Sequence, residues 1–248
     1  MELPNKKIIP KSTNPKFSIF FGKPKSGKTT IMAALENNLI IDLEDGTNYV
    51  EAMAIKASNV TEIKDIAKEI HKAGNPYKYI TIDTATALED MILPMALDKY
   101  RNTPMGKMFG YNQQKGTYEF VDIRTLPNGA GYLYIRESFQ EVVNVFKGLT
   151  EHLILLGHTK DRTINRNGKE LSENLLDLSG KLERIISSKA DALGYVYRNG
   201  NKTIINFNGG DDLIVEARPA HLRGKEIVIA ESDDDGVITT YWDRIFID

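Results

Sequence analysis

Along the chain, short runs of apolar and β-branched residues alternate with segments whose apolar positions recur every three or four residues. Buried strands are predicted by four such runs, at residues 17–21, 39–42, 78–83 and 152–158. Helices are predicted by four periodic segments, at residues 28–37, 61–72, 87–100 and 137–149. Strands that alternate with helices are typical of βαβ units, so we predict an α/β fold with a mainly parallel central sheet flanked by helices.

Three later segments depart from this alternation. Residues 102–136 mix five glycines with four tyrosines and predict a long loop insertion, and the polar residues 159–174 predict a second loop. Beyond residue 192, an Asn-Gly turn between two β-rich runs predicts a C-terminal β-hairpin region, with further strands near 225–230 and 237–242. We therefore expect a basic segment at 1–16, one domain over 17–248, and a β-rich end at 192–248.

The composition is that of a globular protein. The 248 residues are 41% apolar and 27% charged, which excludes collagen-like, disordered and coiled-coil classes. No apolar run approaches the roughly 20 residues that span a bilayer, and the first seven residues lack the apolar core of a secretory signal. We expect a cytoplasmic protein with no membrane partner.

Charge and cysteine content narrow the candidate chemistry. The chain has no cysteine and only four histidines, which excludes a disulfide framework and a thiolate metal site. A net charge of −2 gives no overall attraction to nucleic acid, so only local clusters could bind it. The ends differ in charge: residues 1–16 hold four lysines, and residues 231–248 hold six acids against Arg244. Both terminal segments are expected to be exposed to solvent, and a docking tail for partner proteins is the alternative for the acidic C-terminal segment.

The sequence from Gly22 to Thr29, GKPKSGKT, fits the pattern G-x-x-x-x-G-K-[ST] between a predicted strand and a predicted helix. Backbone N–H groups in such a loop, together with the helix dipole, bind phosphate. We expect the loop to bind ATP, with Lys28 on the β- and γ-phosphates and the Thr29 hydroxyl on Mg²⁺. The predicted nucleotide-binding residues are Gly22, Lys23, Pro24, Lys25, Ser26, Gly27, Lys28, Thr29 and Thr30.

Carboxylates end two predicted strands, at the sheet edge where ligands of open α/β sheets bind. Asp83 is expected to hold Mg²⁺ opposite Thr29, and capping of the next helix is an alternative that does not exclude this role. Glu44 is predicted to orient or deprotonate the attacking water, with Asp42 on the same face of the extended chain. A solvated acidic turn is the alternative for this second group.

The ordered motifs GKPKSGKT, LIIDLEDG, YITIDTATAL and LILLGHTKDR resemble those of the RecA-like ATPases, which include RecA and Rad-type recombinases and DnaB-type helicases. The resemblance implies a RecA-like P-loop NTPase in which Glu44 is the catalytic glutamate, Asp83 the magnesium aspartate and His158 a sensor of the γ-phosphate. A buried histidine with satisfied hydrogen bonds is the alternative for His158. In size and motif order the chain is similar to phage single-strand annealing and recombination proteins of the Sak-four-like, AAA_24 type.

The predicted hairpin resembles a helicase hairpin whose arginine reaches the nucleotide of the neighbouring subunit. By that match Arg198 is a catalytic residue supplied in trans and Lys202 a weaker candidate, although Val196 stands where the helicase pattern has another basic residue. The resemblance thus implies a homo-oligomer with ATP at its subunit interfaces.

RecA-like proteins bind single-stranded DNA through two loops, which here correspond to residues 102–136 and 159–174. The basic residues in and beside these segments are Arg101, Lys107, Lys115, Arg124 and Arg136 in the first and Lys160, Arg162, Arg166 and Lys169 in the second. Cations among tyrosines suit a single strand, whereas tyrosines packed on the protein itself are the alternative.

From these observations we predict a Mg²⁺-dependent ATPase that oligomerises on single-stranded DNA and promotes annealing or strand exchange in phage-type recombination. A single-strand-binding protein is a further expected partner, and the host cytoplasm is the expected location if the chain is phage-encoded. A ring-forming helicase or loader of DnaB type and a non-DNA assembly NTPase are the alternatives.

Overall fold

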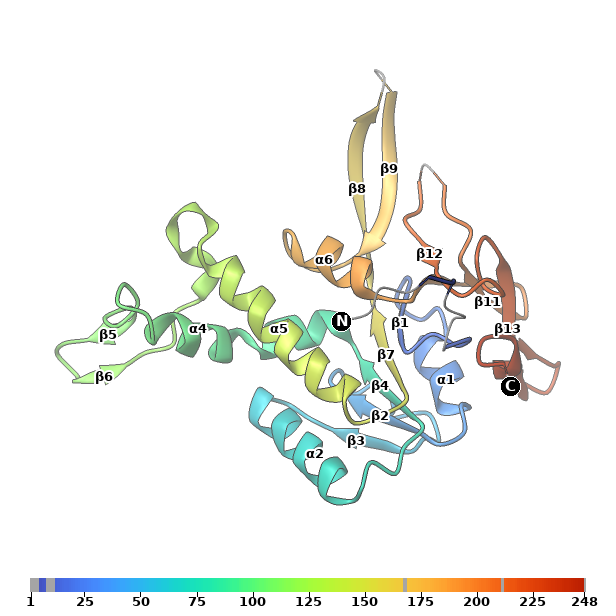
Figure 1. Cartoon of the computed structure of the whole chain (residues 1–248), viewed down its shortest axis with the longest axis horizontal. Coiled ribbons are helices and arrows are strands. Elements are labelled where there is room, and N and C mark those ends of the chain that lie inside the picture. Colours follow the sequence, from blue (N-terminus) through green and yellow to red (C-terminus); the bar gives the residue numbers. More distant parts are fainter. Residues whose placement is uncertain (1–4, 8–11, 167–168, 211, 248) are drawn as a thin grey trace.

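A large mixed sheet forms the centre of the structure, a computed structural model that describes residues 5–7, 12–166, 169–210 and 212–247 (Figure 1). The ten strands of the sheet follow the order β14-β13-β11-β10-β1-β7-β4-β2-β3, and β12 pairs with β10. They are β1 (Phe17–Phe21), β2 (Asn38–Asp42), β3 (Ala54–Lys56), β4 (Tyr79–Asp83), β7 (His152–Gly157), β10 (Ala192–Asn199), β11 (Lys202–Asn206), β12 (Glu216–Ala217), β13 (Glu226–Ser232) and β14 (Ile238–Thr240). Pairing is parallel from β10 across to β3, and antiparallel on the other side of β10. The predicted α/β fold, with its parallel centre and C-terminal hairpin region, is confirmed.

Apolar side chains cover both faces of this sheet. In β1, Phe17, Ile19 and Phe21 belong to one core cluster and Phe20 to the other, as expected from the alternation of side chains along a strand. The first cluster includes residues of five helices, α2 (Val60–Lys72), α3 (Ala85–Met91), α4 (Leu93–Arg101), α5 (Gly131–Lys147) and α6 (Leu182–Lys189). The second lies between the sheet, the short helix α1 (Lys28–Ala33) and the 3₁₀ turn η3 (Trp242–Arg244). A strand buried on both faces explains the continuous apolar runs in the sequence.

Two predicted helices differ in extent from the observed ones. The segment predicted at 87–100 is divided between α3 and α4, because Pro94 lies in the first turn of α4 and cannot continue a helix from the preceding residues. The helix predicted at 28–37 ends at Ala33, since Asn38 already donates its side-chain amide to the carbonyl of Met32 at 2.8 Å. The chain therefore turns early into β2.

The predicted loop at 159–174 is wrong, because this segment forms a β-hairpin. Strands β8 (Thr159–Arg166) and β9 (Lys169–Leu176) pair with each other from Thr159 opposite Leu176 to Arg166 opposite Lys169. The hairpin projects from the end of β7, well beyond the central sheet (Figure 1). Helix α6 (Leu182–Lys189), which no sequence pattern indicated, follows its base.

Residues 102–136 are also more ordered than a loop. They contain the short hairpin of β5 (Tyr111–Asn112) and β6 (Thr117–Tyr118), the 3₁₀ turns η1 (Ile123–Thr125) and η2 (Pro127–Gly129), and the first turns of α5. With the end of α4 they form an arm that extends away from the sheet (Figure 1). Of the predicted basic segment 1–16, residues 1–4 and 8–11 lie outside the described residues, and Lys6 and Lys7 are exposed.

Candidate active site

The loop between β1 and α1 holds the predicted phosphate-binding residues at the carboxyl edge of the parallel strands. The Gly22 N–H donates to the carbonyl of Gly157 in β7 at 3.1 Å. A Cβ on Gly22 would lie 2.2 Å from the Val196 carbonyl oxygen of β10, so only glycine fits there. Gly27 adopts φ 91°, a left-handed conformation that favours glycine. Both glycines of the motif are thus required by the backbone.

Lys28 lies inside this loop, with 6% of its surface exposed. Its Nζ donates to the carbonyls of Gly22 and Lys23, each at 3.0 Å. Burial lowers the pKa of the Lys28 ammonium, and the charges of Asp83 and Glu44 oppose that shift. A buried ammonium of this kind is stabilised by an anion that enters the loop.

Thr29 and Asp83 meet across the gap between α1 and β4. The Thr29 hydroxyl donates to Asp83 Oδ2 at 2.6 Å, and Asp83 is 3% exposed. Burial raises the pKa of Asp83, and the nearby charges of Asp42 and Glu44 add to the effect. Gly46 packs against the pair, since a Cβ there would lie 3.3 Å from Thr29 Oγ1 and 3.4 Å from Asp83 Oδ2.

This hydroxyl and carboxylate fit a magnesium ion that is delivered with a nucleotide. Within the described part of the chain there is no group of three or more His, Cys, Asp or Glu residues that could hold a metal by themselves. Mg²⁺ needs fewer protein ligands, because it keeps several waters and is bound by one or two side chains together with substrate phosphates. Burial, and after it the charges of Asp42 and Glu44, raise the pKa of Asp83, and a bound cation would oppose both effects by stabilising the carboxylate. When bound, Mg²⁺ would neutralise phosphate charge.

Glu44 lies just beyond the end of β2 and contacts two neighbouring strand ends. Its Oε1 accepts from the Thr84 hydroxyl at 3.0 Å, and its Oε2 lies 3.0 Å from His158 Nε2. The hydrogen bond to His158 lowers the pKa of Glu44, partly opposed by burial, and the bond from Thr84 adds to the lowering. Glu44 is therefore held as a carboxylate whose two oxygens are oriented by residues following β4 and β7.

Asp42, expected to act together with Glu44, is engaged by its own loop instead. Its carboxylate accepts from the backbone N–H groups of Glu44, Gly46 and Thr47 at 2.9–3.1 Å, and from the Thr47 hydroxyl at 2.5 Å. Burial acts to raise the pKa of Asp42, but these hydrogen bonds outweigh it and lower the pKa. Asp42 thus shapes the turn that presents Glu44.

The two basic residues of the predicted β10–β11 hairpin lie in different places. The guanidinium of Arg198 lies beside the phosphate-binding loop of its own chain, with Nη2 3.2 Å from an ideal Cβ on Gly27. Lys202 pairs with Glu231 of β13 at 3.3 Å. Only Arg198 is therefore brought to the site.

One cavity of about 470 Å³ brings most of these side chains together. Its lining residues are Pro24, Lys25, Gly27, Lys28, Thr29, Thr30, Glu44, Gly46, Val50, Asp83, Thr84, His158 and Arg198. The residues predicted for the site that do not line it are Gly22, Lys23, Ser26, Asp42 and the weaker candidate Lys202. The sequence analysis did not predict that Gly46 and Val50 line the cavity, or that the Thr84 hydroxyl donates a hydrogen bond to Glu44. The Asp83-Thr84 pair at the end of a strand was a usable signal for Thr84, whereas Gly46 and Val50 carried none.

The predicted DNA-binding segments use several of their cations internally. In the arm, Arg124 pairs with Asp122 at 2.7 Å and Lys115 with Glu119 at 2.8 Å, and Arg101 donates to the Phe109 carbonyl at 3.0 Å. Tyrosines of the arm pack on each other, with the rings of Tyr111 and Tyr118 5.1 Å apart. In the β8–β9 hairpin, Arg162 pairs with Glu173 at 2.8 Å and Lys160 with Asp177 at 3.6 Å. The remaining basic positions in these segments are Lys107, Arg136, Arg166 and Lys169.

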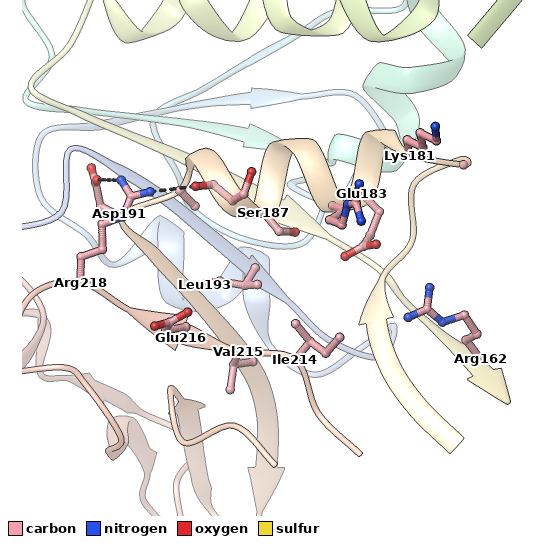
Figure 2. Close-up of a pocket in the computed structure, with 14 residues that line it drawn as sticks. Arg162, Lys181, Glu183, Ser187, Asp191, Leu193, Ile214, Val215, Glu216 and Arg218 are labelled. Carbon is pink, nitrogen blue, oxygen red and sulfur yellow. Dashed lines mark hydrogen bonds and ion pairs between the residues drawn. The ribbon is translucent and has the colours of Figure 1, made fainter. Parts of the chain in front are cut away.

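A second cavity, of about 500 Å³, lies between α6 and the start of β10 and shares no residue with the first (Figure 2). Asp191 and Arg218 form an ion pair at its edge, at 3.0 Å. Glu183 on α6 is buried in its wall, and burial raises the pKa of that carboxyl. Cations and carboxylates are mixed around this cavity, in contrast to the phosphate-binding loop.

No helix in the described ranges is long and apolar enough to cross a membrane.

A family comparison agrees with the P-loop character of the site. The family model AAA_24, an AAA domain, matches residues 14–220. No curated protein matches the chain. Among solved structures, the chain is similar to the RadB recombinase, with 10% identity, a TM-score of 0.48 and 92% of each chain covered. It is also similar to a KaiC-like protein from the hyperthermophilic archaeon Pyrococcus horikoshii OT3, with 14% identity, a TM-score of 0.44, and 91% and 89% of the two chains covered. The family match runs from just before β1 to just after β12.

Proposed function

Because this chain belongs to the AAA_24 family of AAA domains, we propose that it is a Mg²⁺-dependent ATPase of RecA type that oligomerises on single-stranded DNA and promotes annealing or strand exchange in phage-type recombination. In this proposal residues 17–248 form one ATPase domain, and nucleotide binds at subunit interfaces. The observation that carries the ATPase is the convergence of Lys28, Thr29, Asp83 and Glu44 on one cavity at the carboxyl edge of the sheet.

The cavity is lined by both cations and carboxylates, a combination that suits Mg²⁺-ATP. Lys25, Lys28 and Arg198 line it together with the loop backbone, and they attract phosphate. Glu44 and Asp83 line the same cavity and supply the carboxylates that a metal ion and an attacking water molecule need. We infer that Thr29 and Asp83 hold Mg²⁺ and that Glu44 orients the water that attacks the γ-phosphate.

His158 connects this chemistry to the projecting hairpin. Its Nε2 contacts Glu44, and the next residue, Thr159, begins β8. The His158 carbonyl also accepts from the Asp177 N–H at 2.9 Å, just beyond β9. We infer that His158 exchanges its contact with Glu44 for one with the γ-phosphate. This exchange would shift the position of the β8–β9 hairpin at the point where it leaves His158.

The β8–β9 hairpin is the part of the chain that we propose for contact with single-stranded DNA. Arg166 and Lys169 are opposite each other next to its tip. A strand that carries phosphates would be attracted to such a pair, with an affinity that depends on salt. A single-strand-binding protein is a further partner in this proposal.

The deciding experiment measures ATP hydrolysis with and without single-stranded DNA. We expect Mg²⁺-dependent hydrolysis that DNA stimulates, and a loss of at least about 100-fold in Lys28→Ala. Lys64→Ala, which removes an exposed cation on α2, is the matched control and should retain the activity. If single-stranded DNA does not change the rate of hydrolysis, the proposed DNA binding is contradicted, whereas the proposed ATPase activity is not.

Electron microscopy separates this recombinase from a motor of DnaB type. Open filaments, or annealing without unwinding, support the proposal. Closed rings that unwind a forked duplex would support the motor instead.

A second candidate, a non-DNA assembly NTPase, is favoured by the surface of the arm. Met105, Met108 and Phe120 are 86%, 59% and 62% exposed, which is unusual for such large apolar side chains. An arm that exposes large apolar side chains, and in which Lys115 and Arg124 pair with carboxylates, suits a protein partner better than a nucleic acid. We expect Met105→Ser/Phe120→Ser to abolish self-association in sedimentation velocity if the arm binds a second copy, and to leave DNA-stimulated hydrolysis unchanged if it does not.

A further inference from the structure

The position of Arg198 follows from how β10 pairs with β1. The two strands are parallel, with Phe21, the last residue of β1, opposite Tyr195. β10 continues for four more residues, to Asn199, so these residues run beside the phosphate-binding loop that leaves β1. The loop packs directly on this extension, because Gly22 lies against the Val196 carbonyl.

Side-chain alternation then directs Arg198 toward the loop. Val196 is fully buried in the cluster that contains Ile31 and Met32 of α1, and Arg198, two residues on, projects from the same face of the sheet. Tyr195 and Tyr197 stack on the opposite face, with ring centroids 6.1 Å apart. The register and the strand pleat therefore place the guanidinium above the loop of the same chain.

The contacts of the guanidinium agree with this geometry. Its Nη2 and Nε lie 3.2 and 3.3 Å from an ideal Cβ on Gly27, and Arg198 lines the same cavity as Lys28 and Thr29. Among the described residues, the guanidinium of Arg198 has no hydrogen-bond or ion-pair partner, and the other cations that line its cavity are Lys25 and Lys28. Cations that share a cavity without a carboxylate partner for the arginine form a site for an anion.

We propose that Arg198 binds a phosphate of the nucleotide held by its own subunit, in cis, and does not act as a finger for the neighbouring subunit. This inference rests on the proposed nucleotide binding and sharpens it. Guanidinium N–H groups match phosphate oxygens in a bidentate manner, which a point charge such as Lys28 cannot do. The same hairpin offers a matched control in Lys202, which pairs with Glu231 and does not line the cavity.

A binding measurement on the isolated subunit tests the proposal. Mg²⁺-ATP is titrated by calorimetry into wild type, Arg198→Ala, Arg198→Lys and Lys202→Ala, at concentrations where sedimentation shows monomers. We expect Arg198→Ala to weaken ATP binding about 10- to 100-fold, Arg198→Lys to weaken it less, and Lys202→Ala to leave it unchanged. Circular dichroism verifies folding, and Arg198→Lys serves if Arg198→Ala does not fold. Wild-type affinity in the arginine variants would overturn the cis assignment.

Mixing subunits gives an independent second test. Arg198→Ala is combined with Lys28→Ala, and ATP hydrolysis is measured against either variant alone. In cis, both subunits have a damaged site of their own, so we expect no recovery. In trans, the Lys28→Ala subunit supplies its arginine to an intact loop, and recovered hydrolysis would overturn the inference. A wild type that binds no ATP would instead refute the proposed function itself.

Discussion

Glu44 and Asp83 are carboxylates beside the same cavity, yet their surroundings move their pKa values in opposite directions. Hydrogen bonds from His158 and Thr84 hold the pKa of Glu44 below its usual range, whereas burial raises that of Asp83. Opposite shifts in one site separate the roles of two acids. In the proposed mechanism, Glu44 is the ionised carboxylate that orients a water molecule, and Asp83 is the one that gains most from a cation.

Replacing Asp83 by a neutral residue should therefore stabilise the nucleotide-free protein and lower its ATPase activity. A raised pKa in the folded state means that the nucleotide-free protein loses stability as pH rises from the unfolded pKa of this carboxyl to the folded one. We expect Asp83→Asn to raise the melting temperature at pH 7 and to lower kcat at least about 100-fold. Thermal melts between pH 4 and 8, with Asp65→Asn on the exposed face of α2 as the control, measure this. A variant that melts below wild type at pH 7 would contradict it.

The His158 contact should be visible in the pH profile of hydrolysis. Removing this hydrogen bond raises the pKa of Glu44, so in His158→Ala the acidic limb of kcat moves to higher pH. We also expect kcat at its optimum to fall about tenfold or more, because a charge-assisted hydrogen bond orients the glutamate. His71→Ala on α2, an exposed histidine, is the control. An unchanged acidic limb would show that Glu44 is not the titrating group.

Among the helices and strands, the sequence predicted most accurately the strands that are buried on both faces. β1, β2, β4 and β7 appear as continuous apolar runs because the core imposes them. The strands of the β8–β9 hairpin form a separate two-stranded sheet. Over most of its length neither face of this sheet covers the core, so burial imposes no alternating pattern on the sequence. Gly131 indicated a loop, yet it lies in α5, where a Cβ would be 1.9 Å from the Ile123 carbonyl. A glycine required by close packing cannot be told from a helix breaker in sequence.

The same distinction applies to the candidate site. Lys28, Thr29, Asp83 and Glu44 follow strand ends, and parallel strands bring their ends to one edge, so local patterns were enough to predict their convergence. The side of the loop on which Arg198 lies depends on the pairing of β10 with β1, residues more than 170 positions apart. Such long-range register leaves no local signal.

The C-terminal β-rich end should stabilise the phosphate-binding loop through α1. Trp242 is 8% exposed, its indole Nε1–H donates to the Ile31 carbonyl at 3.0 Å, and its ring packs on Phe20 and Phe246. We expect Trp242→Ala to lower the free energy of unfolding by about 3–5 kcal/mol and to weaken ATP binding. Urea unfolding measures the first effect, with the exposed Val237→Ala as control. ATP affinity that is unchanged in a folded variant would refute the link to α1.

The charge of the whole molecule limits how it could bind the proposed single-stranded DNA. The net charge is −2, and four cations of the arm and hairpin, Lys115, Arg124, Lys160 and Arg162, pair with carboxylates on the same chain. One subunit therefore presents few phosphate contacts. In the proposed function, tight binding would come from several subunits on one strand, because linked contacts add up without any single one being strong.

This argument predicts a particular salt dependence. For single strands, the slope of log affinity against log salt is about −0.7 per phosphate contact. With fluorescence anisotropy of labelled oligothymidine, we expect a shallow slope and weak binding on oligomers that hold one subunit, and a much steeper slope on longer ones. Arg166→Ser/Lys169→Ser should reduce the slope on the long strand, whereas Lys64→Ser/Lys68→Ser, on α2, should not. A steep slope already on the shortest oligomer would mean that one subunit binds DNA tightly by itself. It would contradict the prediction that several subunits are needed.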